Sequence, residues 1–301
     1  MNTNITTIEK NSFKAWLLAM RLHTIPLSLV PVITVSALAY KLDSFNLIPA
    51  LVCLTFAGLM QIVVNLSNDY YDFINGADTP DRVGFTRLVA NGLLEGKKVL
   101  FVTAIFCAIA CLLGLTLIFY SSWWLIFVGL FCVIGAYGYT AGPYPFAYHA
   151  LGDLVVFIFF GLVSTAFSFY VQALEFHWTL WILGIAFGLT IVNILVVNNV
   201  RDVEADRKVN KITSVVLFGT KFGEYFYLVN GLIAGLICLL FLKAGWLGGA
   251  FLPQLFLIFH FRIWRKLCTQ TGSSLDNILK QTVLNVMLLG GLIVIGLLLL
   301  P

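Results

Sequence analysis

The chain has 301 residues, of which 60% are hydrophobic and only 11% are charged, and its formal charge is +4. Soluble domains carry about 25% charged residues, so this composition excludes a soluble globular protein and indicates a protein embedded in the lipid bilayer. The small positive charge requires no nucleic acid partner, and we expect no obligate protein partner.

Nine apolar runs approach or exceed the length of about 20 residues with which a helix crosses the hydrocarbon layer. They cover roughly residues 15–40, 47–68, 99–119, 122–140, 152–173, 178–199, 225–242, 245–261 and 282–300. The first run lacks a cleavage site of small residues and is expected to remain as a span. The sequence therefore predicts an all-α polytopic membrane protein with nine transmembrane helices, in which residues 1–301 form one domain.

The basic residues predict the orientation of these spans. Sixteen of the eighteen Lys and Arg residues fall in the N-terminal segment or follow the second, sixth and eighth spans, and only Lys41 and Lys243 lie on the other side. Because cytoplasmic loops keep an excess of Lys and Arg, we expect the N-terminus to lie in the cytoplasm.

Polar residues concentrate at the end of the second predicted span, in the segment NLSNDYYDFINGAD (residues 65–78). Positions i, i+3, i+4 and i+7 share one helix face, so a continued helix would present one acidic stripe there. This stripe comprises Asn65, Asn68, Asp69 and Asp72. Gly76 predicts the end of the helix. The following loop holds Asp78, Asp81, Arg82 and Arg87.

A second polar segment, NNVRDVEADRKVNKIT (residues 198–213), ends the sixth predicted span. Its members recur every four positions, as Asn198, Asp202, Asp206 and Asn210, with Arg201, Arg207 and Lys211 beside them. Both segments end even-numbered spans, so both are predicted to emerge on the cytoplasmic side, where they could face each other.

These two segments and the loop after the first hold seven of the fourteen acidic residues. The rule for basic loops does not explain them, because acidic residues contribute little to orientation. Clustered carboxylates at a membrane boundary repel one another and need a cation. The candidate ligands are oxygens without Cys or His, which favours Mg²⁺ bound together with substrate phosphates. The pattern therefore predicts a magnesium–diphosphate site.

Both segments resemble the two Asp-rich motifs of the UbiA superfamily of intramembrane prenyltransferases, and the resemblance covers the whole chain. The segments RLHTIPLSLVP (21–31) and YTAGPYPFAYHALGDLVVFIFFG (139–161) are similar to its 1,4-dihydroxy-2-naphthoate polyprenyltransferase branch, which acts in menaquinone synthesis. The resemblance implies a nine-helix bundle, a polyprenyl diphosphate donor, an aromatic acceptor and Mg²⁺. It also implies a bacterial inner membrane, with the active site near the cytoplasmic side.

By position, the resemblance assigns the metal and diphosphate ligands as Asp69, Asp72, Asp202 and Asp206. The other residues that we expect to bind substrate are Asn65, Asn68, Asp78, Arg82, Arg201, Asn198 and Asp153. Three departures from the branch concern the acceptor rather than these carboxylates. Gly84-Phe85-Thr86-Arg87 replaces Gly-Pro-x-Arg, Asn210 replaces a Gly, and SVVLFG before Thr220 lacks an Arg.

The expected reaction begins when the metal ions, Arg87, Arg201 and Lys211 draw the diphosphate away from the allylic carbon. The acceptor ring then attacks the allylic cation, and loss of a proton or of CO₂ restores aromaticity. Tyr139 is a catalytic candidate that would shield the cation, as are Tyr70 or Tyr71, whose alternative role is anchoring at the membrane interface.

Three further residues have no single role at this stage. Asp153 is either an acceptor-side residue or the N-cap of the fifth span. His149 is either a base or a solvated loop residue, and His23 has no partner that the sequence identifies.

Two other functions stay open on the sequence. Paired Asn and Asp residues on helices also suit an ion-coupled transporter, although transporter sites lie near the bilayer midplane and these residues lie toward helix ends. Another superfamily enzyme would use a different acceptor, such as hydroxybenzoate or homogentisate.

Overall fold

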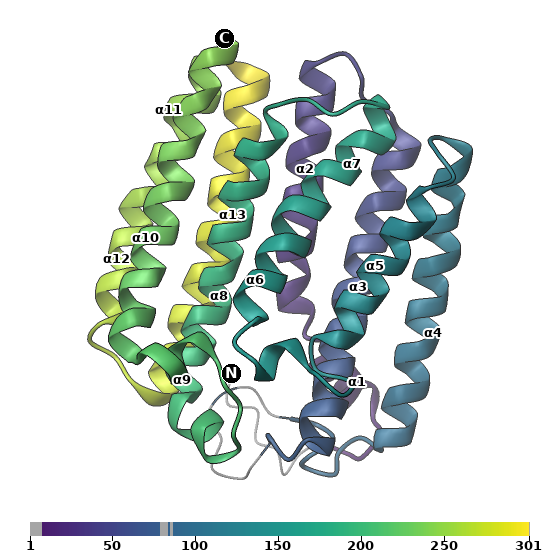
Figure 1. The fold of residues 1–301 in the computed structure, drawn as a ribbon, viewed down its shortest axis with the longest axis vertical. Helices are drawn as coiled ribbons and strands as arrows, with labels where there is room; N and C mark the ends of the chain where they lie inside the picture. Colours follow the sequence, from purple (N-terminus) through teal and green to yellow (C-terminus); the bar gives the residue numbers. More distant parts are fainter. Residues whose placement is uncertain (1–7, 79–83, 85–86, 301) are drawn as a thin grey trace.

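The computed structural model describes residues 8–78, 84 and 87–300, and within them every named element of regular structure is a helix. Figure 1 shows long helices that run side by side between the end marked N and the end marked C. The first half contains α1 (Phe13–Met20), α2 (Ile25–Lys41), α3 (Leu47–Ile74), α4 (Gly96–Leu115), α5 (Leu125–Gly138), α6 (Gly152–Val156) and α7 (Ser164–Ala173). The second half contains α8 (Leu180–Lys208), α9 (Ser214–Phe218), α10 (Thr220–Cys238), α11 (Leu247–Phe251), α12 (Phe256–Leu267) and α13 (Leu275–Leu299).

Eight helical segments of the described chain are long and apolar enough to cross a membrane, which makes this an integral multi-pass membrane protein. They include α1 and α2 together, and α6 and α7 together. The predicted span over residues 122–140 is the 14-residue helix α5, which is shorter than a full crossing of about 20 residues.

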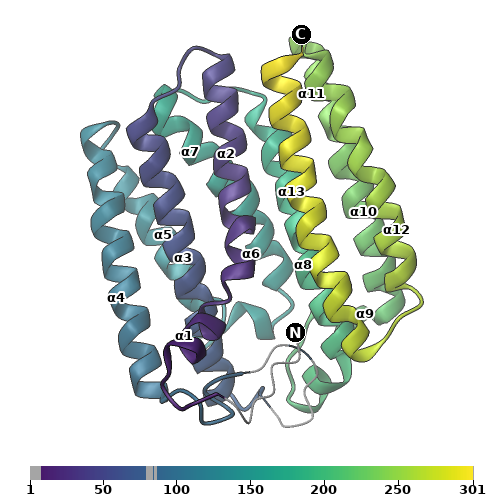
Figure 2. The ribbon, with the colours of Figure 1, turned by 180° about the vertical axis from the view of Figure 1, so that it is seen from behind.

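The central element of the bundle is α8, whose apolar part is the most buried of the eight spans. It packs against α10, α13 and the π-helical turn Phe157–Val163 that joins α6 to α7. Figure 2 shows α2 beside α13 on the far side of the bundle, so the N-terminal and C-terminal spans close around α8. The fold thereby brings the ends of α3 and α8 to one end of the molecule.

The first predicted span is interrupted, which the sequence did not predict. Arg21 ends α1 with a φ of 47°, in the left-handed region, and a short turn leads into α2. Asn65 stabilises this break from α3, because its amide Nδ2 donates to the carbonyl of Met20 at 2.9 Å and to Thr24 Oγ1 at 3.0 Å. The break turns Arg21 into the interior of the bundle.

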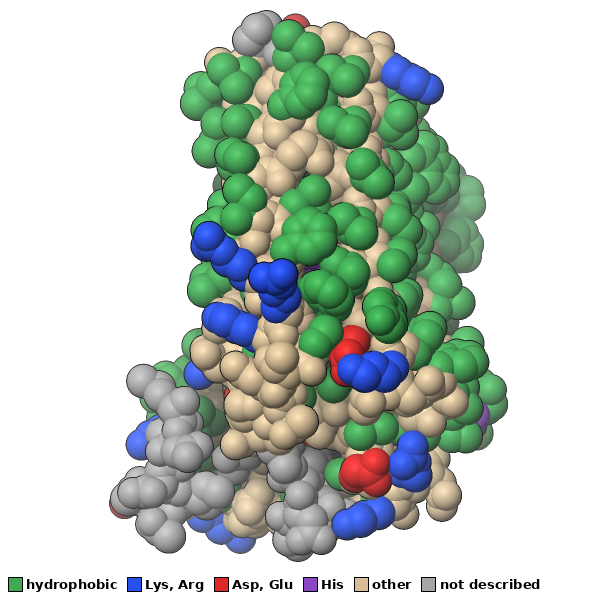
Figure 3. Space-filling view, turned by 90° about the vertical axis from the view of Figure 1, so that its left-hand side faces the viewer, with side chains coloured by type: hydrophobic (Ala, Val, Ile, Leu, Met, Phe, Trp, Pro, Cys, Tyr) green, Lys and Arg blue, Asp and Glu red, His purple; other side chains and the backbone are tan. Residues whose placement is uncertain are grey.

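The distribution of charge over the bundle follows the sequence pattern. The basic residues of the described chain lie at the end that carries the N-terminus, except Lys41 and Lys243 at the opposite end. Figure 3 shows the consequence on one face, where apolar side chains cover the upper part and charged side chains gather below. An apolar belt with a basic end is the arrangement expected for a membrane bundle.

Candidate active site

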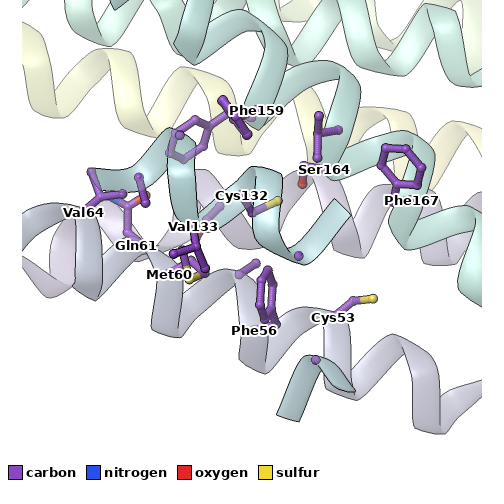
Figure 4. Close-up of a pocket in the computed structure, with 18 of the residues that line it drawn as sticks. Cys53, Phe56, Met60, Gln61, Val64, Cys132, Val133, Phe159, Ser164 and Phe167 are labelled. Carbon is purple, nitrogen blue, oxygen red and sulfur yellow. The ribbon is translucent and has the colours of Figure 1, made fainter. Parts of the chain in front are cut away.

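A cavity of about 560 Å³ lies among α2, α3, α5, α7 and α8. Figure 4 shows apolar side chains from α3, such as Phe56 and Met60, across from Phe159 and Phe167. Along α3 the lining runs from Cys53 to Asn68, which is about 22 Å at 1.5 Å per residue. Such a long apolar space suits a hydrocarbon chain.

One end of the cavity is polar, and it is the end at which α3 and α8 carry their acidic segments. Its polar lining comprises Arg21, Thr24, Gln61, Asn65, Asn68, Tyr139 and Asn198. Thr140 Oγ1 donates to Asn68 Oδ1 at 3.0 Å, which fixes the orientation of this amide. The structure therefore brings four residues predicted from the sequence, Asn65, Asn68, Asn198 and Tyr139, to one cavity.

Asp72 occupies the centre of the first acidic segment and is 2% exposed. Arg87 Nη2 donates to its Oδ2 at 2.8 Å, and the same guanidinium contacts Asp78 through Nε at 3.1 Å. Arg87 Nη1 is buried and makes no hydrogen bond with the described residues. The pairing offsets the cost of burying these charges and leaves Arg87 with a donor for an anion.

Tyr148 joins the first acidic segment to the second. Its hydroxyl donates to Asp72 Oδ1 at 2.8 Å, and Lys211 Nζ lies 5.4 Å from the centre of its ring. Burial and the charge of Asp72 raise the pKa of Tyr148, so its hydroxyl remains a donor. The contact exists because Ala150 N donates to Ile212 O at 2.7 Å, which pairs the loop before α6 with the loop after α8.

Asp69 faces the loop that follows α3 rather than the cavity. Its carboxylate accepts hydrogen bonds from the backbone N–H groups of Leu88 and Val89, at 3.3 and 3.1 Å, and lies 3.9 Å from Arg21. These bonds hold the segment that carries Arg87 against α3. Asp69 is thus well placed to position the loop.

In the second acidic segment, Arg201 is held between two carboxylates. Its Nε and Nη2 donate to the two oxygens of Asp202 at 2.8 and 2.9 Å, and its Nη1 donates to Asp276 of α13 at 2.7 Å. Gly84 packs against this guanidinium, because a Cβ built on Gly84 would lie 2.6 Å from Arg201 Cζ. The loop of the first segment therefore contacts the side chains of the second.

The end of α8 positions Asp206 and Lys211 together. Lys211 Nζ lies 3.7 Å from Asp206 Oδ1, and the backbone N–H of Lys211 donates to the carbonyl of Asp206 at 2.9 Å. This turn requires Asn210 to adopt a φ of 56°, which Asn tolerates better than other residues with a Cβ. Asn210, which stands where the branch has Gly, therefore keeps the left-handed backbone conformation that this turn needs.

The donor set fits a hard divalent cation shared with a phosphate group. Among the described residues, no three Asp, Glu, His or Cys side chains converge as a protein-only metal site. Mg²⁺ does not require one, since it is typically held by one or two carboxylates together with substrate phosphates and water. The two segments offer the carboxylate oxygens of Asp72 and Asp206, with Arg87 beside the first and Lys211 beside the second.

Several sequence predictions need correction. Asn210 lies beyond the last residue of α8, so it is not on the stripe of Asn198, Asp202 and Asp206. Asp153 lies in the first turn of α6 and caps no backbone N–H; the N-cap is Leu151.

The other residues singled out in the sequence have mixed outcomes. Tyr70 and Tyr71 do not line the cavity, in contrast to Tyr139. Gly76 does end α3 as predicted, with a φ of 71°. Arg82 lies outside the described residues.

The sequence reasoning missed three residues of the site. Tyr148 and Thr140 lie in the segment that carries the branch resemblance, but their partners are distant in the chain. Asp276 begins the last span, where an acidic residue also suits the N-terminus of a helix. Only the packing of α13 on α8 brings Asp276 to Arg201.

An apolar cavity that meets buried ion pairs at one end suits a long apolar chain with an anionic head group, which is the class of substrate that a membrane prenyltransferase handles. The chain belongs to the UbiA prenyltransferase family, whose sequence profile matches residues 28–297. Membership of an enzyme family decides against the transporter alternative.

Curated relatives of this chain cover most of its length. The chain is 38% identical to the 1,4-dihydroxy-2-naphthoate octaprenyltransferase of Mycobacterium tuberculosis, over 74% of this chain and 75% of that protein. It is 36% identical to the Escherichia coli protein of the same name, over 75% of each chain. The Haemophilus influenzae protein of that name is 31% identical over 95% of this chain and 96% of its own.

Solved structures share the fold. A UbiA homologue from Aeropyrum pernix superposes with a TM-score of 0.72 at 16% identity, over 91% of this chain and 98% of that chain. A UbiA homologue from Archaeoglobus fulgidus, solved with DMAPP and Mg²⁺, has a TM-score of 0.66 at 15% identity, over 92% of this chain and 98% of that chain.

Proposed function

We propose that this enzyme transfers a polyprenyl group from a polyprenyl diphosphate to 1,4-dihydroxy-2-naphthoate, a step of menaquinone synthesis. The observation that carries the proposal is the apolar cavity whose polar end lies beside two ion-paired acidic segments. The acceptor is taken from the relatives in three bacteria that bear this name at 31–38% identity.

The diphosphate would bind between the two acidic segments. We assign the metal ligands as Asp69, Asp72, Asp202 and Asp206, with Asn65 and Asn68 supporting them. Asp69 would bind a metal through the lone pairs that its hydrogen bonds to Leu88 N and Val89 N leave available. Bound Mg²⁺ would neutralise charge on the departing diphosphate. Arg87 offers the buried Nη1, and Lys211 offers its ammonium beside Tyr148, so both can hold phosphate oxygens. Asp78 and Asp202 orient Arg87 and Arg201, respectively.

The prenyl chain would lie along the apolar lining, with its allylic carbon near Asn68, Asn198 and Tyr139. The ring of Tyr139 would face the developing allylic cation. The acceptor would lie at the same polar end, where Arg21 offers a positive charge to its carboxylate. The carboxylate would direct the ring carbon that it occupies toward the allylic carbon, and CO₂ would leave after the new bond forms.

We also propose how the enzyme is placed in its membrane. Residues 1–301 would form one domain with nine transmembrane helices, α5 being the short one. The basic end would face the cytoplasm of a bacterial inner membrane, where soluble diphosphate can leave.

The experiment is a transfer assay in nanodiscs with Mg²⁺, geranylgeranyl diphosphate and 1,4-dihydroxy-2-naphthoate, with the product mass recorded. The proposal predicts a decarboxylated prenyl naphthoquinol that Asp72→Asn and Asp206→Asn abolish. Glu175→Gln is the matched control, because Glu175 is exposed in the loop at the opposite end. If product forms only with a different phenolic acceptor, and none forms with 1,4-dihydroxy-2-naphthoate, the naphthoate assignment is rejected.

A further inference from the structure

A second pocket, of about 20 Å³, adjoins the main cavity near its polar end. Its polar lining comprises Tyr139, Asp153, Asn199, Lys211, Thr213 and Ser214. Tyr139 and Leu195 line both spaces, so the side chain of Tyr139 stands between them. The smaller space has room for one water molecule, which needs about 10–15 Å³.

Two buried atoms of residues that line this pocket make no hydrogen bond of good geometry with the described residues, although the side chains of Asp153 and Ser214 interact with each other. The two atoms are Asp153 Oδ1 and Ser214 Oγ, which come from α6 and α9. Thr213 Oγ1 caps α9 by accepting from Val216 N at 3.2 Å and therefore leaves Ser214 to face the pocket. Because buried polar atoms normally have a full hydrogen-bond partner, one water molecule between Asp153 and Ser214 would complete the weak interaction of these two side chains.

The hydroxyl of Tyr139 lies at the start of α6, beside Asp153. A Cβ built on Gly152 would lie 3.3 Å from this hydroxyl, so the absence of a side chain at residue 152 lets the two approach. The side chain of Tyr139 is buried and lies in the field of the Asp153, Asp72 and Asp206 carboxylates, so its hydroxyl keeps its proton. A tyrosine that keeps its proton can accept one proton while it donates another.

We propose that Tyr139, one water molecule and Asp153 form a proton relay that holds the phenolic proton of the acceptor during prenyl transfer. This inference rests on the proposed function and deepens it. Asp153 lines the smaller pocket and not the substrate cavity, so it acts through Tyr139 and is a positioning and proton-storing residue rather than a catalytic one.

The acceptor hydroxyl beside the carboxylate gives its proton to the oxygen of Tyr139, whose own proton passes through the water to Asp153. The electron pair of the broken O–H bond forms a ring carbonyl, and the ring carbon bonds to the allylic carbon as its C–O bond to diphosphate breaks. The intermediate is a β-keto carboxylate. Loss of CO₂ returns its electron pair to the ring, and the resulting phenolate takes the proton back.

The kinetic test compares Tyr139→Phe, Asp153→Asn and the double variant in nanodiscs with Mg²⁺ and geranylgeranyl diphosphate. The relay predicts that each single change lowers kcat at least tenfold with little change in the KM of the donor, and that the double variant loses no more. If the fold-losses of kcat of the two single variants multiply in the double variant, the two residues act independently and the relay is overturned. Tyr170→Phe is the matched control, because its hydroxyl bonds to Ser122 at the opposite end.

Two further measurements keep the inference independent of a folding defect. For the Asp153→Ala variant, added formate should restore part of kcat if Asp153 acts as a proton acceptor, and a lack of rescue in a folded variant would count against it. The acid limb of the kcat profile should also disappear in Asp153→Asn, while Lys211 and Tyr139, the other titratable groups of the pocket, remain.

The outcomes separate this inference from the proposed function. If the unchanged enzyme prenylates a different phenol, the naphthoate assignment fails, and the same variants compared on that phenol decide the relay. A high-resolution experimental structure of the full chain should contain a water within hydrogen-bond distance of Asp153 and Ser214. A dry pocket would overturn the relay whatever the acceptor.

Discussion

Tyr148 illustrates how much of this site depends on single side chains. Its hydroxyl bonds to Asp72 and its ring lies beside Lys211, so one residue couples carboxylate and ammonium groups from segments more than 100 positions apart. Neither contact follows from local periodicity. A sequence can indicate that a loop tyrosine is present, but not which distant carboxylate it reaches.

Changing Tyr148 to Phe should lower kcat about 10-fold to 100-fold, since a hydrogen bond to a charged group contributes about 1.5–3 kcal/mol. Burial and Asp72 raise the pKa of Tyr148 above its usual value of about 10, so the hydroxyl keeps its proton through the neutral range. The ratio of mutant to unchanged rates should therefore be constant between about pH 6 and pH 9. A ratio that changes with pH in this range would show that the Tyr148 hydroxyl loses its proton and does not donate to Asp72 throughout.

Gly84 provides a second test at single-residue resolution. Its φ is 118° and a Cβ there would overlap the guanidinium of Arg201, so Gly84→Ala should displace Arg201 and weaken donor binding. Gly92→Ala is the matched control, because Gly92 also has a positive φ of 69° but has open space around it. We expect a raised KM for the diphosphate donor in Gly84→Ala alone. Equal effects of both changes would indicate backbone strain rather than the Arg201 contact.

At the scale of elements, the two acidic segments were predictable because each extends a helix whose periodicity continues through it. α3 runs to Ile74 and α8 to Lys208, which places Asn65, Asp69 and Asp72 on one helix and Asp202 and Asp206 on the other. The interruption at Arg21 was not predictable, because no Gly or Pro stands at that residue and the left-handed turn depends on hydrogen bonds from Asn65.

The end of α8 gives a prediction about stability. Replacing Asn210 by Gly should leave activity unchanged and slow thermal inactivation slightly, because Gly adopts a positive φ at no steric cost. Replacing it by Ala should destabilise the protein by about 1 kcal/mol and misplace Lys211. Residual activity after graded heating measures both. Equal heat resistance of the Ala and Gly variants would refute the assigned role of this turn.

At the scale of the whole molecule, composition was sufficient for the class and for the number of long spans to within one. Helix packing was not predictable in the same way, because the contacts of α13 with α2 and α8 depend on shape rather than on periodicity. The pairing of Asp276 with Arg201 is one result of that packing. The residues that line the cavity could likewise not be predicted, because nearly all of them are apolar and every span contains such residues.

The orientation of the bundle can be tested with single cysteines and a membrane-impermeant maleimide on intact cells. If the basic end faces the cytoplasm as we propose, Lys243→Cys should be labelled from outside, and Lys208→Cys should be labelled only after the membrane is opened. Burial raises the pKa of the native Cys268 to about 11, so its background reaction is slow. The reverse labelling pattern would show that the basic end faces outside and that the proposed orientation is wrong.

We propose that both acidic segments bind one magnesium–diphosphate group. The most direct measurement is the melting temperature of the purified protein with and without geranylgeranyl diphosphate, in Mg²⁺ and in EDTA. A ligand at 100 times its Kd stabilises the folded protein by about 2.7 kcal/mol. We therefore expect the donor to raise the melting temperature clearly in Mg²⁺ and not in EDTA. We predict that Asp72→Asn and Asp206→Asn each abolish this rise and that Glu175→Gln does not. A rise that persists in EDTA, or in either Asp variant, would contradict it.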